Sequence, residues 1–326
     1  MREDAVNFLR NLRGKVKIVT HRDIDGVCSL AILLNFLETR EVEEEHEFME
    51  AYLDKLNTTD QMIFLDISLD NILKFATDKT LVIDHHPYSK KIDKITFYNP
   101  RENDPESYIP TTYLIYEVIS EIEDIDEMKW IVAVGIVGDR GDLNSEFCRN
   151  FIKDFDYEKL ELAARFIFSA DLIDHNKGLE KALQILKKSK KLDEVLDNIY
   201  LKYCYDEVQR EIQNSKKKIE KEDNVFFIEI DTKYNIKSII ASNFLDKYKD
   251  AIVIAYYSRE NYYYISGRTN TNLNIGKIFG EVAKTCGGSG GGHEKAAGAR
   301  IKKDKIELFK EEFLIRLNYL NLTSKK

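Results

Sequence analysis

The first 140 residues alternate short apolar runs with longer amphipathic stretches. The apolar runs KIVT, MIFLD, LVID and ITFYN begin at residues 17, 62, 81 and 95. Helical patterns follow at 27–37 and 111–122, and the stretch 128–138 has the uniform apolarity of a buried helix. Short strands that alternate with helices are typical of a parallel sheet whose connections cross over its faces. The pattern therefore predicts an α/β domain built on a parallel sheet.

The rest of the chain contains a helical region followed by a second α/β pattern. Residues 151–222 follow a helical pattern, and we interpret their Lys-rich segments at 187–191 and 216–223 as solvated helix faces and a linker. A new unit begins with the strand pattern VFFIEI at 225–230. It continues with a helix, two strands, a helix, a Gly-rich loop and a terminal helix, expected near 236–248, 251–257, 262–267, 274–285, 287–292 and from 304. A length of 326 residues fits two such domains.

Charge is distributed unevenly along the chain. The net charge is −8, but residues 224–326 carry 17 basic and 11 acidic side chains, a net of +6, which leaves −14 on residues 1–223. The acidic total excludes broad coating of nucleic acid by a basic surface. It allows a local contact with phosphate groups through the basic last part of the chain.

Cysteine usage and hydropathy indicate the compartment. The four cysteines, Cys28, Cys148, Cys204 and Cys286, form no CxxC pair, which favours reduced thiols over a disulfide framework or a structural zinc site. The first 15 residues are charged and lack the apolar region of a signal peptide. The apolar run 130–138 is also far shorter than the ~18 residues of a membrane span. We therefore expect a cytoplasmic protein that does not enter a membrane.

Acidic and histidine side chains stand at the ends of successive predicted strands. The segment HRDIDG (21–26) follows the first strand, Asp66 closes the second, and DHHP (84–87) closes the third, while Asp139 follows the buried helical stretch. Each Asp taken alone could be a helix cap, and an Asp–His pair could be structural. Because the carboxyl ends of parallel strands meet at one edge of a sheet, we expect these side chains to lie close together.

Converging carboxylates repel one another at neutral pH unless cations lie among them. Four or five carboxylates with one or two imidazoles suit hard to borderline ions such as Mn²⁺ or Mg²⁺. Two such ions bridged by a carboxylate would form a centre for hydrolysing phosphate esters. The sequence therefore predicts a metal site at this edge of the sheet.

A glycine-rich segment marks the second unit. Six of the 15 glycines fall within residues 286–298. Consecutive glycines expose backbone N–H groups that can surround an anion, and the guanidinium of Arg268 can grip a phosphate with two donors. His293 could donate to a phosphate oxygen. The alternatives are a flexible linker for the glycines and a surface ion pair for Arg268, but linkers do not usually lie between apolar elements.

With these motifs in this order, the chain resembles the DHH family of phosphoesterases with a DHHA1 domain. HRDIDG, FLDIS, VIDHHP and GIVGD correspond to the four motifs of the DHH domain, and GGGHEKAAG corresponds to the DHHA1 signature. The resemblance implies a parallel-sheet DHH domain joined by a helical linker to a smaller α/β DHHA1 domain, with the active site in the cleft between them. The expected ranges are 1–195, 196–223 and 224–326.

The resemblance also implies a role for each site residue. Two Mn²⁺ ions are expected, with Mg²⁺ or Co²⁺ as alternatives. The ligands of one metal would be His21, Asp23 and Asp66. The ligands of the other would be Asp25, Asp66, His85 and Asp139, so that Asp66 bridges the two. Asp84 would orient the histidines, and His86 would face the phosphate. The groups that grip the substrate would be Arg268, Gly290, Gly291, Gly292 and His293.

The first motif indicates the class of substrate. His21 lies two positions before Asp23, as in RecJ-like and archaeal exonucleases, whereas members that act on pAp, nanoRNA or cyclic-di-AMP usually carry a longer motif. We therefore expect cleavage of single-stranded DNA or RNA, or of short oligonucleotides, to mononucleotides. The alternatives are a cyclic-di-AMP phosphodiesterase, a nanoRNase or a pAp phosphatase. From a different class, the alternative is a non-catalytic assembly partner in replication or repair. Family members are often homodimers.

Overall fold

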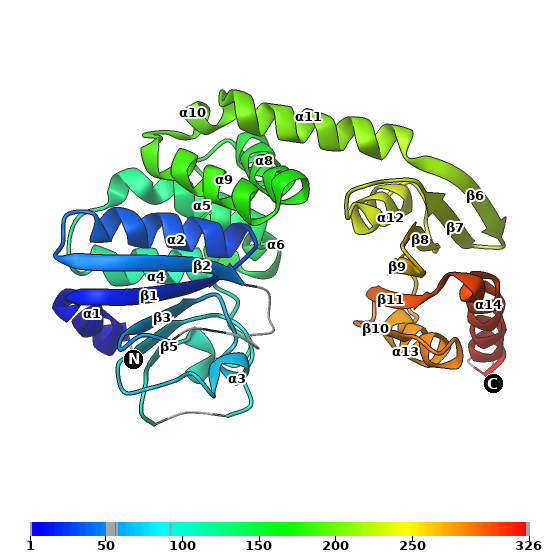
Figure 1. Cartoon of the computed structure of the whole chain (residues 1–326), viewed down its shortest axis with the longest axis horizontal. Coiled ribbons are helices and arrows are strands. Elements are labelled where there is room, and N and C mark those ends of the chain that lie inside the picture. The colour runs from blue at the N-terminus through cyan, green and yellow to red at the C-terminus, as the bar shows by residue number, and fades with distance from the viewer. Residues whose placement is uncertain (1, 50–55, 57, 91–92, 324–326) are drawn as a thin grey trace. The chain divides into compact units, whose positions relative to one another are not determined.

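The computed structural model describes residues 2–49, 56, 58–90 and 93–323, which form two compact units (Figure 1). The first unit comprises Met1–Asp206 and the second comprises Glu207–Lys326. Each unit has its own sheet and its own hydrophobic core. The expected fold class, a parallel-sheet α/β domain followed by a smaller α/β domain, is confirmed.

The first unit is built on a five-stranded parallel sheet in the order β2-β1-β3-β4-β5. The strands are β1 (Gly14–His21), β2 (Val42–Met49), β3 (Met62–Leu65), β4 (Thr80–Ile83) and β5 (Thr96–Tyr98). The register pairs Thr20 with Leu65 and Leu65 with Ile83, so the three inner strands end at the same level. The loops after β1, β3 and β4 therefore meet at one edge of the sheet.

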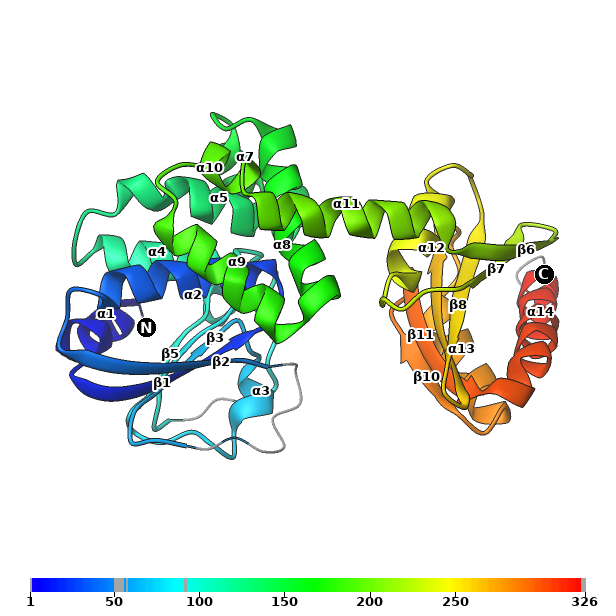
Figure 2. The ribbon, with the colours of Figure 1, turned by 45° about the horizontal axis from the view of Figure 1, so that its top comes forward.

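Helices cover the two faces of this sheet unequally. The helices of the unit are α1 (Arg2–Asn11), α2 (Ile24–Leu37), α3 (Leu69–Ile72), α4 (Thr111–Ser120), α5 (Lys129–Gly138), α6 (Gly141–Asn144), α7 (Glu146–Ile152), α8 (Tyr157–Asp174), α9 (Asn176–Lys188) and α10 (Leu192–Leu196). The boundary between the two units falls within α11 (Ile199–Asn214). The larger core packs Ile18 and Leu65 against several helices, and a smaller core on the opposite face packs Val19 and Phe64 against α3. Figure 2 shows α2 and α9 side by side over the larger core.

The second unit contains a six-stranded sheet in the order β10-β11-β9-β8-β7-β6, in which β7 and β8 are parallel and the other neighbours are antiparallel. Its core is rich in aromatic rings, including Phe279, Phe309 and Phe313. The elements are β6 (Lys216–Glu222), β7 (Val225–Ile230), α12 (Lys237–Leu245), β8 (Ile252–Arg259), β9 (Tyr262–Thr269), α13 (Ile275–Thr285), β10 (Ser289–Gly292), β11 (Ala296–Lys302) and α14 (Ile306–Thr323).

The edge strand β2 has no apolar pattern that would have predicted it. Its sequence, VEEEHEFM, is acidic, and it forms a strand because its backbone pairs with β1. Lys17 of β1 is buried beneath it, with Nζ 3.1 Å from Glu45 and 3.0 Å from Glu47. The two carboxylates compensate the buried ammonium group, which would otherwise be costly.

Two segments of the second half also differ from the expectation. Residues 216–222 were expected to be helical, but they form β6, because α11 ends at Asn214 and the backbone that follows pairs with β7. The glycine-rich segment was expected to be a loop, but residues 289–292 form β10 on the edge of the sheet. In both cases a neighbouring strand supplies hydrogen bonds that local propensity does not encode.

The remaining composition-based expectations concern cysteines and membranes. All four cysteines are buried free thiols. Across the described ranges, no helix combines the length and the apolar character that crossing a membrane requires.

Candidate metal centre

The loop after β1 places His21, Asp23 and Asp25 around the start of α2. Asp23 caps the helix, because its Oδ1 accepts a 2.9 Å hydrogen bond from the backbone N–H of Gly26. Its other oxygen, Oδ2, lies 2.7 Å from Nδ1 of His21. A Cβ at position 26 would lie 2.1 Å from the carbonyl oxygen of His21, so this tight turn requires Gly26. Asp23 is thus a helix cap and a member of the acidic cluster at once.

Asp66 lies between the histidines of two different loops. It follows β3 with a φ of +60°, a left-handed conformation that Asp adopts more readily than most residues. Its buried carboxylate places Oδ2 3.6 Å from Nδ1 of His21. Its Oδ1 lies 3.4 Å from Nε2 of His85 and 3.9 Å from Nδ1 of His86. One carboxylate therefore faces three imidazoles.

His85, in the loop after β4, extends the cluster toward two further carboxylates. Its Nε2 lies 3.9 Å from Oδ2 of Asp25 and 3.6 Å from Oδ2 of Asp139. His86 is 40% exposed, and its Nδ1 lies 2.8 Å from Oδ1 of Asp84. Asp84 thus orients His86, whereas neither ring nitrogen of His85 has a hydrogen-bond partner in the described part of the chain.

The start of α4 holds Asp25 through contacts that sequence reasoning missed. The backbone N–H groups of Thr111 and Thr112 donate to Oδ2 and Oδ1 of Asp25, each at 2.7 Å. The Thr112 hydroxyl also donates to Oδ1, and the Thr111 hydroxyl donates to Asp66 at 3.2 Å. A signal was present, because Pro110 followed by two threonines marks a helix start whose N–H groups favour an anion.

Three further residues support the histidine loop from the side of β5. Arg101 donates from Nε to the carbonyl oxygen of His85 at 2.8 Å, and Asn99 donates from Nδ2 to that of His86 at 2.9 Å. The ring of Tyr108 packs edge-on against His85 at 5.2 Å, and its hydroxyl donates to the carbonyl oxygen of Asp139 at 3.1 Å. These contacts reach backbone atoms, so no motif in the sequence announced them.

The cluster is electrostatically strained without cations. Burial raises the pKa of Asp66 well above its usual range, and the charges of Asp23 and Asp25 raise it further. Burial and the charge of Asp25 raise the pKa of Asp139 to about 8. Burial would lower the pKa of His21, but its hydrogen bonds to Asp23 and Asp66 raise it to about 11. Protons therefore occupy positions at which cations could bind.

The buried polar atoms of the cluster fit divalent cations. In the ranges that the structure describes, the site atoms without a hydrogen-bond partner are Asp66 Oδ2, Asp84 Oδ2, His85 Nδ1, His85 Nε2 and Asp139 Oδ2. Three groups place one ligand atom of each residue within 4.8 Å of the others, namely His21 with Asp23 and Asp66, Asp25 with His85 and Asp139, and Asp66 with His85 and His86. Carboxylate and imidazole ligands without thiolates suit ions such as Mn²⁺ and Mg²⁺.

The second unit brings Arg268 and the glycine segment together in one sheet. Arg268 on β9 lies opposite Ala296 of β11, and Gly290, Gly291 and Gly292 lie on β10, the next strand. Gly291 and Gly292 have φ angles of +152° and +148°, which other residues rarely adopt. His293 follows in an exposed turn, and its carbonyl oxygen accepts a 3.1 Å hydrogen bond from Gly276.

Comparison with known proteins finds a relative by sequence and solved structures of similar fold. The chain is 37% identical over 105 residues to an uncharacterised protein of Methanocaldococcus jannaschii, an alignment that covers 31% of this chain and 22% of that protein. RecJ of Thermus thermophilus, solved in complex with Mn²⁺, superposes on 96% of this chain with a TM-score of 0.67 and 17% identity. The superposition covers 53% of RecJ, so the chain spans about half of its length.

Two further solved structures match almost end to end. The pGpG-specific phosphodiesterase PggH of Vibrio cholerae has a TM-score of 0.58 and 15% identity, with 93% of this chain and 99% of PggH covered. CDC45 of Entamoeba histolytica has a TM-score of 0.60 and 12% identity, with 95% of this chain and 96% of CDC45 covered. At these identities the likeness establishes the fold.

Family models match both units in the order that the motifs predicted. The model for the DHH family, N-terminal domain, matches residues 15–136, and the model for the DHHA1 domain matches residues 222–317. Together they cover more than half of the chain, and the resemblance inferred from the motifs is confirmed. The chain therefore belongs to the DHH family of phosphoesterases and carries a DHHA1 domain after its N-terminal domain.

Proposed function

We propose that the chain is a metal-dependent phosphodiesterase of the RecJ-like exonuclease type, which uses two Mn²⁺ ions to remove mononucleotides from single-stranded DNA or RNA or from short oligonucleotides. The observation that carries the proposal is the cluster around Asp66, in which buried carboxylate and imidazole atoms converge without partners in the described part of the chain. Such an arrangement is costly without cations, which makes a structural role alone a poor explanation.

In this proposal the cluster residues divide between two ions. The ligands of one ion are His21, Asp23 and Asp66, and those of the other are Asp25, Asp66, His85 and Asp139. Ions held there would lower the pKa of water and neutralise the charge of a phosphodiester. Thr111 and Thr112 fix both oxygens of Asp25, so the chain sets the direction of this carboxylate before any ion binds.

His86 is the residue that we assign to contact the phosphate. Its ring is 40% exposed, and its Nδ1 lies 2.8 Å from Asp84. We therefore assign the contact with the phosphate to its other ring nitrogen, Nε2. Burial lowers the pKa of His86 and the hydrogen bond to Asp84 raises it, with a net increase. The raised pKa favours the protonated ring, which can donate a hydrogen bond to a phosphate oxygen.

We assign the grip on the substrate to the second unit, through Arg268, His293 and the N–H groups of Gly290, Gly291 and Gly292. A guanidinium can bind a phosphate with two parallel hydrogen bonds, and a glycine strand lets phosphate oxygens approach the backbone closely. The unit that carries these groups has a net positive charge, with 17 basic and 11 acidic residues in 224–326.

A panel of four substrates tests the proposal. The purified chain is incubated with Mn²⁺, and separately with Mg²⁺ or Co²⁺, and with a single-stranded 30-mer, a 5-mer, cyclic-di-AMP or pAp, and the products are resolved by length. The proposal predicts stepwise loss of the 30-mer to mononucleotides. Absence of hydrolysis with every substrate and every metal would contradict it.

A small-substrate phosphodiesterase is the second candidate, as a cyclic-di-AMP phosphodiesterase, a nanoRNase or a pAp phosphatase. The observation in its favour is the structural match to PggH, a pGpG-specific phosphodiesterase, which covers 99% of PggH and 93% of this chain. Cleavage of the 5-mer, cyclic-di-AMP or pAp with an intact 30-mer would favour this candidate.

A replication or repair assembly partner is the candidate from a different class. The similarity to CDC45 motivates it. The complete set of clustered carboxylates and imidazoles argues against a purely non-catalytic role, because such a role would not require these costly groups. Inactivity across the substrate panel, together with specific capture of a replication or repair protein from the source organism, would support it.

A further inference from the structure

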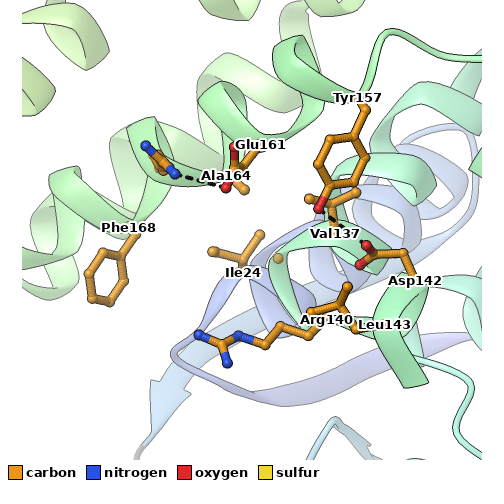
Figure 3. Close-up of a pocket in the computed structure, with 11 residues that line it drawn as sticks. Ile24, Val137, Arg140, Asp142, Leu143, Tyr157, Glu161, Ala164 and Phe168 are labelled. Atoms are coloured by element: carbon orange, nitrogen blue, oxygen red, sulfur yellow. Dashed lines mark hydrogen bonds and ion pairs between the residues drawn. The ribbon is translucent and has the colours of Figure 1, made fainter. Parts of the chain in front are cut away.

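A pocket of about 450 Å³ lies in the first unit beside the metal cluster (Figure 3). It is formed by the start of α2, the end of α5, α6 and α8. Its size falls within the range of small-molecule sites, which is ~300–1,000 Å³. The cluster residues described above do not line it, so it is a separate feature of this unit.

The lining of the pocket combines exposed apolar groups with charged groups at its margin. Leu143, Tyr157 and Phe168 are 65%, 45% and 38% exposed, and all three line it. Ile24 and Val137 add further apolar surface. Large apolar side chains that remain exposed around one pocket are typical of a binding surface.

Arg140 is the charged group of the lining that lacks a partner. Its guanidinium makes no hydrogen bond or ion pair with the residues that the structure describes. By contrast, Arg165 pairs with Glu161 at 2.8 Å. Asp142 accepts a 3.2 Å hydrogen bond from the hydroxyl of Tyr157, as Figure 3 shows. The lining carries two basic and two acidic side chains, and Arg140 is the basic one that no carboxylate pairs with in the described part of the chain.

The chain connects this pocket directly to the metal cluster. Ile24 stands between Asp23 and Asp25, and Arg140 follows Asp139. The two loops also pack on each other, because a Cβ at Gly138 would lie 2.4 Å from Cγ2 of Ile24. A ligand that contacts Ile24 and Arg140 would therefore touch the immediate sequence neighbours of the cluster carboxylates.

We propose that this pocket binds one nucleoside of a single-stranded substrate, next to the phosphate that is cleaved. The base packs against Phe168 and Leu143, and the Arg140 guanidinium contacts the adjoining phosphate. Base stacking on aromatic side chains tolerates any sequence because every base has a π-face. The pocket thereby accounts for a preference for unpaired strands, since a base inside a duplex cannot enter it. This inference rests on the proposed function.

Substrates that lack one base test the pocket. The wild-type chain is given a native single-stranded 5-mer and matched 5-mers with an abasic tetrahydrofuran nucleotide on either side of the phosphodiester that is cleaved. Removing the base that occupies the pocket raises KM by about tenfold or more, given the typical energy of one stacked base. The phosphates are unchanged, so the comparison isolates the base.

Two variants test whether this change in KM arises in the pocket. Phe168→Ala removes the ring, and Arg140→Gly removes the guanidinium without strain, because Arg140 has a φ of +60° that Gly adopts freely. Phe168→Ala raises KM for the native 5-mer and abolishes the difference in KM between the native and the abasic 5-mer. Arg140→Gly raises KM for both. The controls are Tyr203→Ala, an exposed ring on α11, and Lys153→Ala, an exposed cation after α7, and both keep the wild-type KM.

The outcomes separate this inference from the proposed function. Equal KM values for native and abasic strands, or variants that behave as the controls do, overturn the pocket proposal while hydrolysis still stands. If no strand is hydrolysed, the proposed function fails, and the same comparison is made by fluorescence anisotropy of a labelled 5-mer. Equal Kd values for native and abasic strands in that measurement then overturn the pocket as well.

Discussion

Thr112 donates both its backbone N–H and its hydroxyl to Oδ1 of Asp25, which lies 87 positions earlier in the chain. Because the N–H of Thr111 binds the other oxygen, the start of α4 holds this carboxylate in one orientation. Thr112 packs closely there, since a Cβ at Gly135 would lie 2.3 Å from its Oγ1. The position of one proposed ligand is therefore set by a helix that carries none.

Thr112→Val should weaken metal binding without unfolding the chain. The change keeps the backbone donor and the shape of the side chain but removes the hydroxyl, so Asp25 loses one of its fixed contacts. We expect Mn²⁺ affinity to fall by about tenfold, as is typical when a group that orients a ligand is lost. Titration calorimetry measures the affinity. Thr285→Val, at an exposed position of α13, is the matched control and should bind Mn²⁺ as the wild type does.

Asp66→Asn should abolish hydrolysis and stabilise the metal-free chain. Asn tolerates the left-handed backbone at this position, so the change removes a charge without strain. We expect activity to fall by about a hundredfold or more. The pKa of Asp66 is raised in the folded state, so its ionisation opposes folding above the ordinary pKa of a carboxyl group.

Thermal unfolding of the metal-free proteins checks the second half of this prediction. The midpoint of Asp66→Asn should exceed that of the wild type at pH 7. The difference should shrink as the pH falls and vanish below about pH 3, where the wild-type carboxyl group is protonated in both states. Added Mn²⁺ should raise the midpoint of the wild type far more than that of the variant. Full activity in Asp66→Asn would refute the two-metal assignment.

Mn²⁺ affinity should rise steeply with pH. The pKa of His21 is raised to about 11 and that of Asp139 to about 8, so both groups carry a proton at pH 7 when no metal is bound. An ion can use them as ligands only after these protons leave, so proton release accompanies binding and alkaline pH favours it. We expect affinity to increase by about tenfold or more per pH unit between pH 6 and 8.

Calorimetry in buffers of different ionisation enthalpy counts the released protons. Circular dichroism over the same pH range controls for unfolding. An affinity that is flat between pH 6 and 8 would mean that neither His21 nor Asp139 is a ligand.

Arg268→Ala should weaken substrate binding and leave Mn²⁺ binding unchanged. The residue lies in the second unit, whereas the proposed metal ligands all lie in the first. We expect KM for a single-stranded 5-mer to rise by about tenfold, and Arg268→Lys to recover only part of this loss because an ammonium cannot make the bidentate contact. The control is Arg259→Ala, at the exposed last position of β8. A kcat defect with an unchanged KM would contradict a role in binding.

The sequence predicted the chemical groups of the site better than the contacts that hold them. Asp66 and His85 were expected to meet because parallel strands end at one edge, and their side chains do lie 3.4 Å apart. The roles of Thr111, Tyr108 and Arg101 were missed. They act through backbone atoms or through residues far away in the chain, and neither kind of contact leaves a pattern along the sequence.

The secondary structure, too, could be predicted only in part from the sequence. Buried strands such as 62–65 were predicted because their side chains are apolar, whereas residues 42–49 and 216–222 were missed because pairing with a neighbour decides their conformation. The glycine segment was recognised by its composition, but its extended form depends on β11. A pattern along the chain reports burial, and it does not report hydrogen bonds to a partner strand.

The acidic strand β2 has a consequence for self-association. It is the end strand of its sheet, and no strand among the described residues pairs with its outer side. A second copy that tried to extend the sheet there would bring VEEEHEFM beside VEEEHEFM, and rows of like charge would oppose each other. The acidic sequence of β2 therefore disfavours pairing of this sheet edge with the same edge of a second copy.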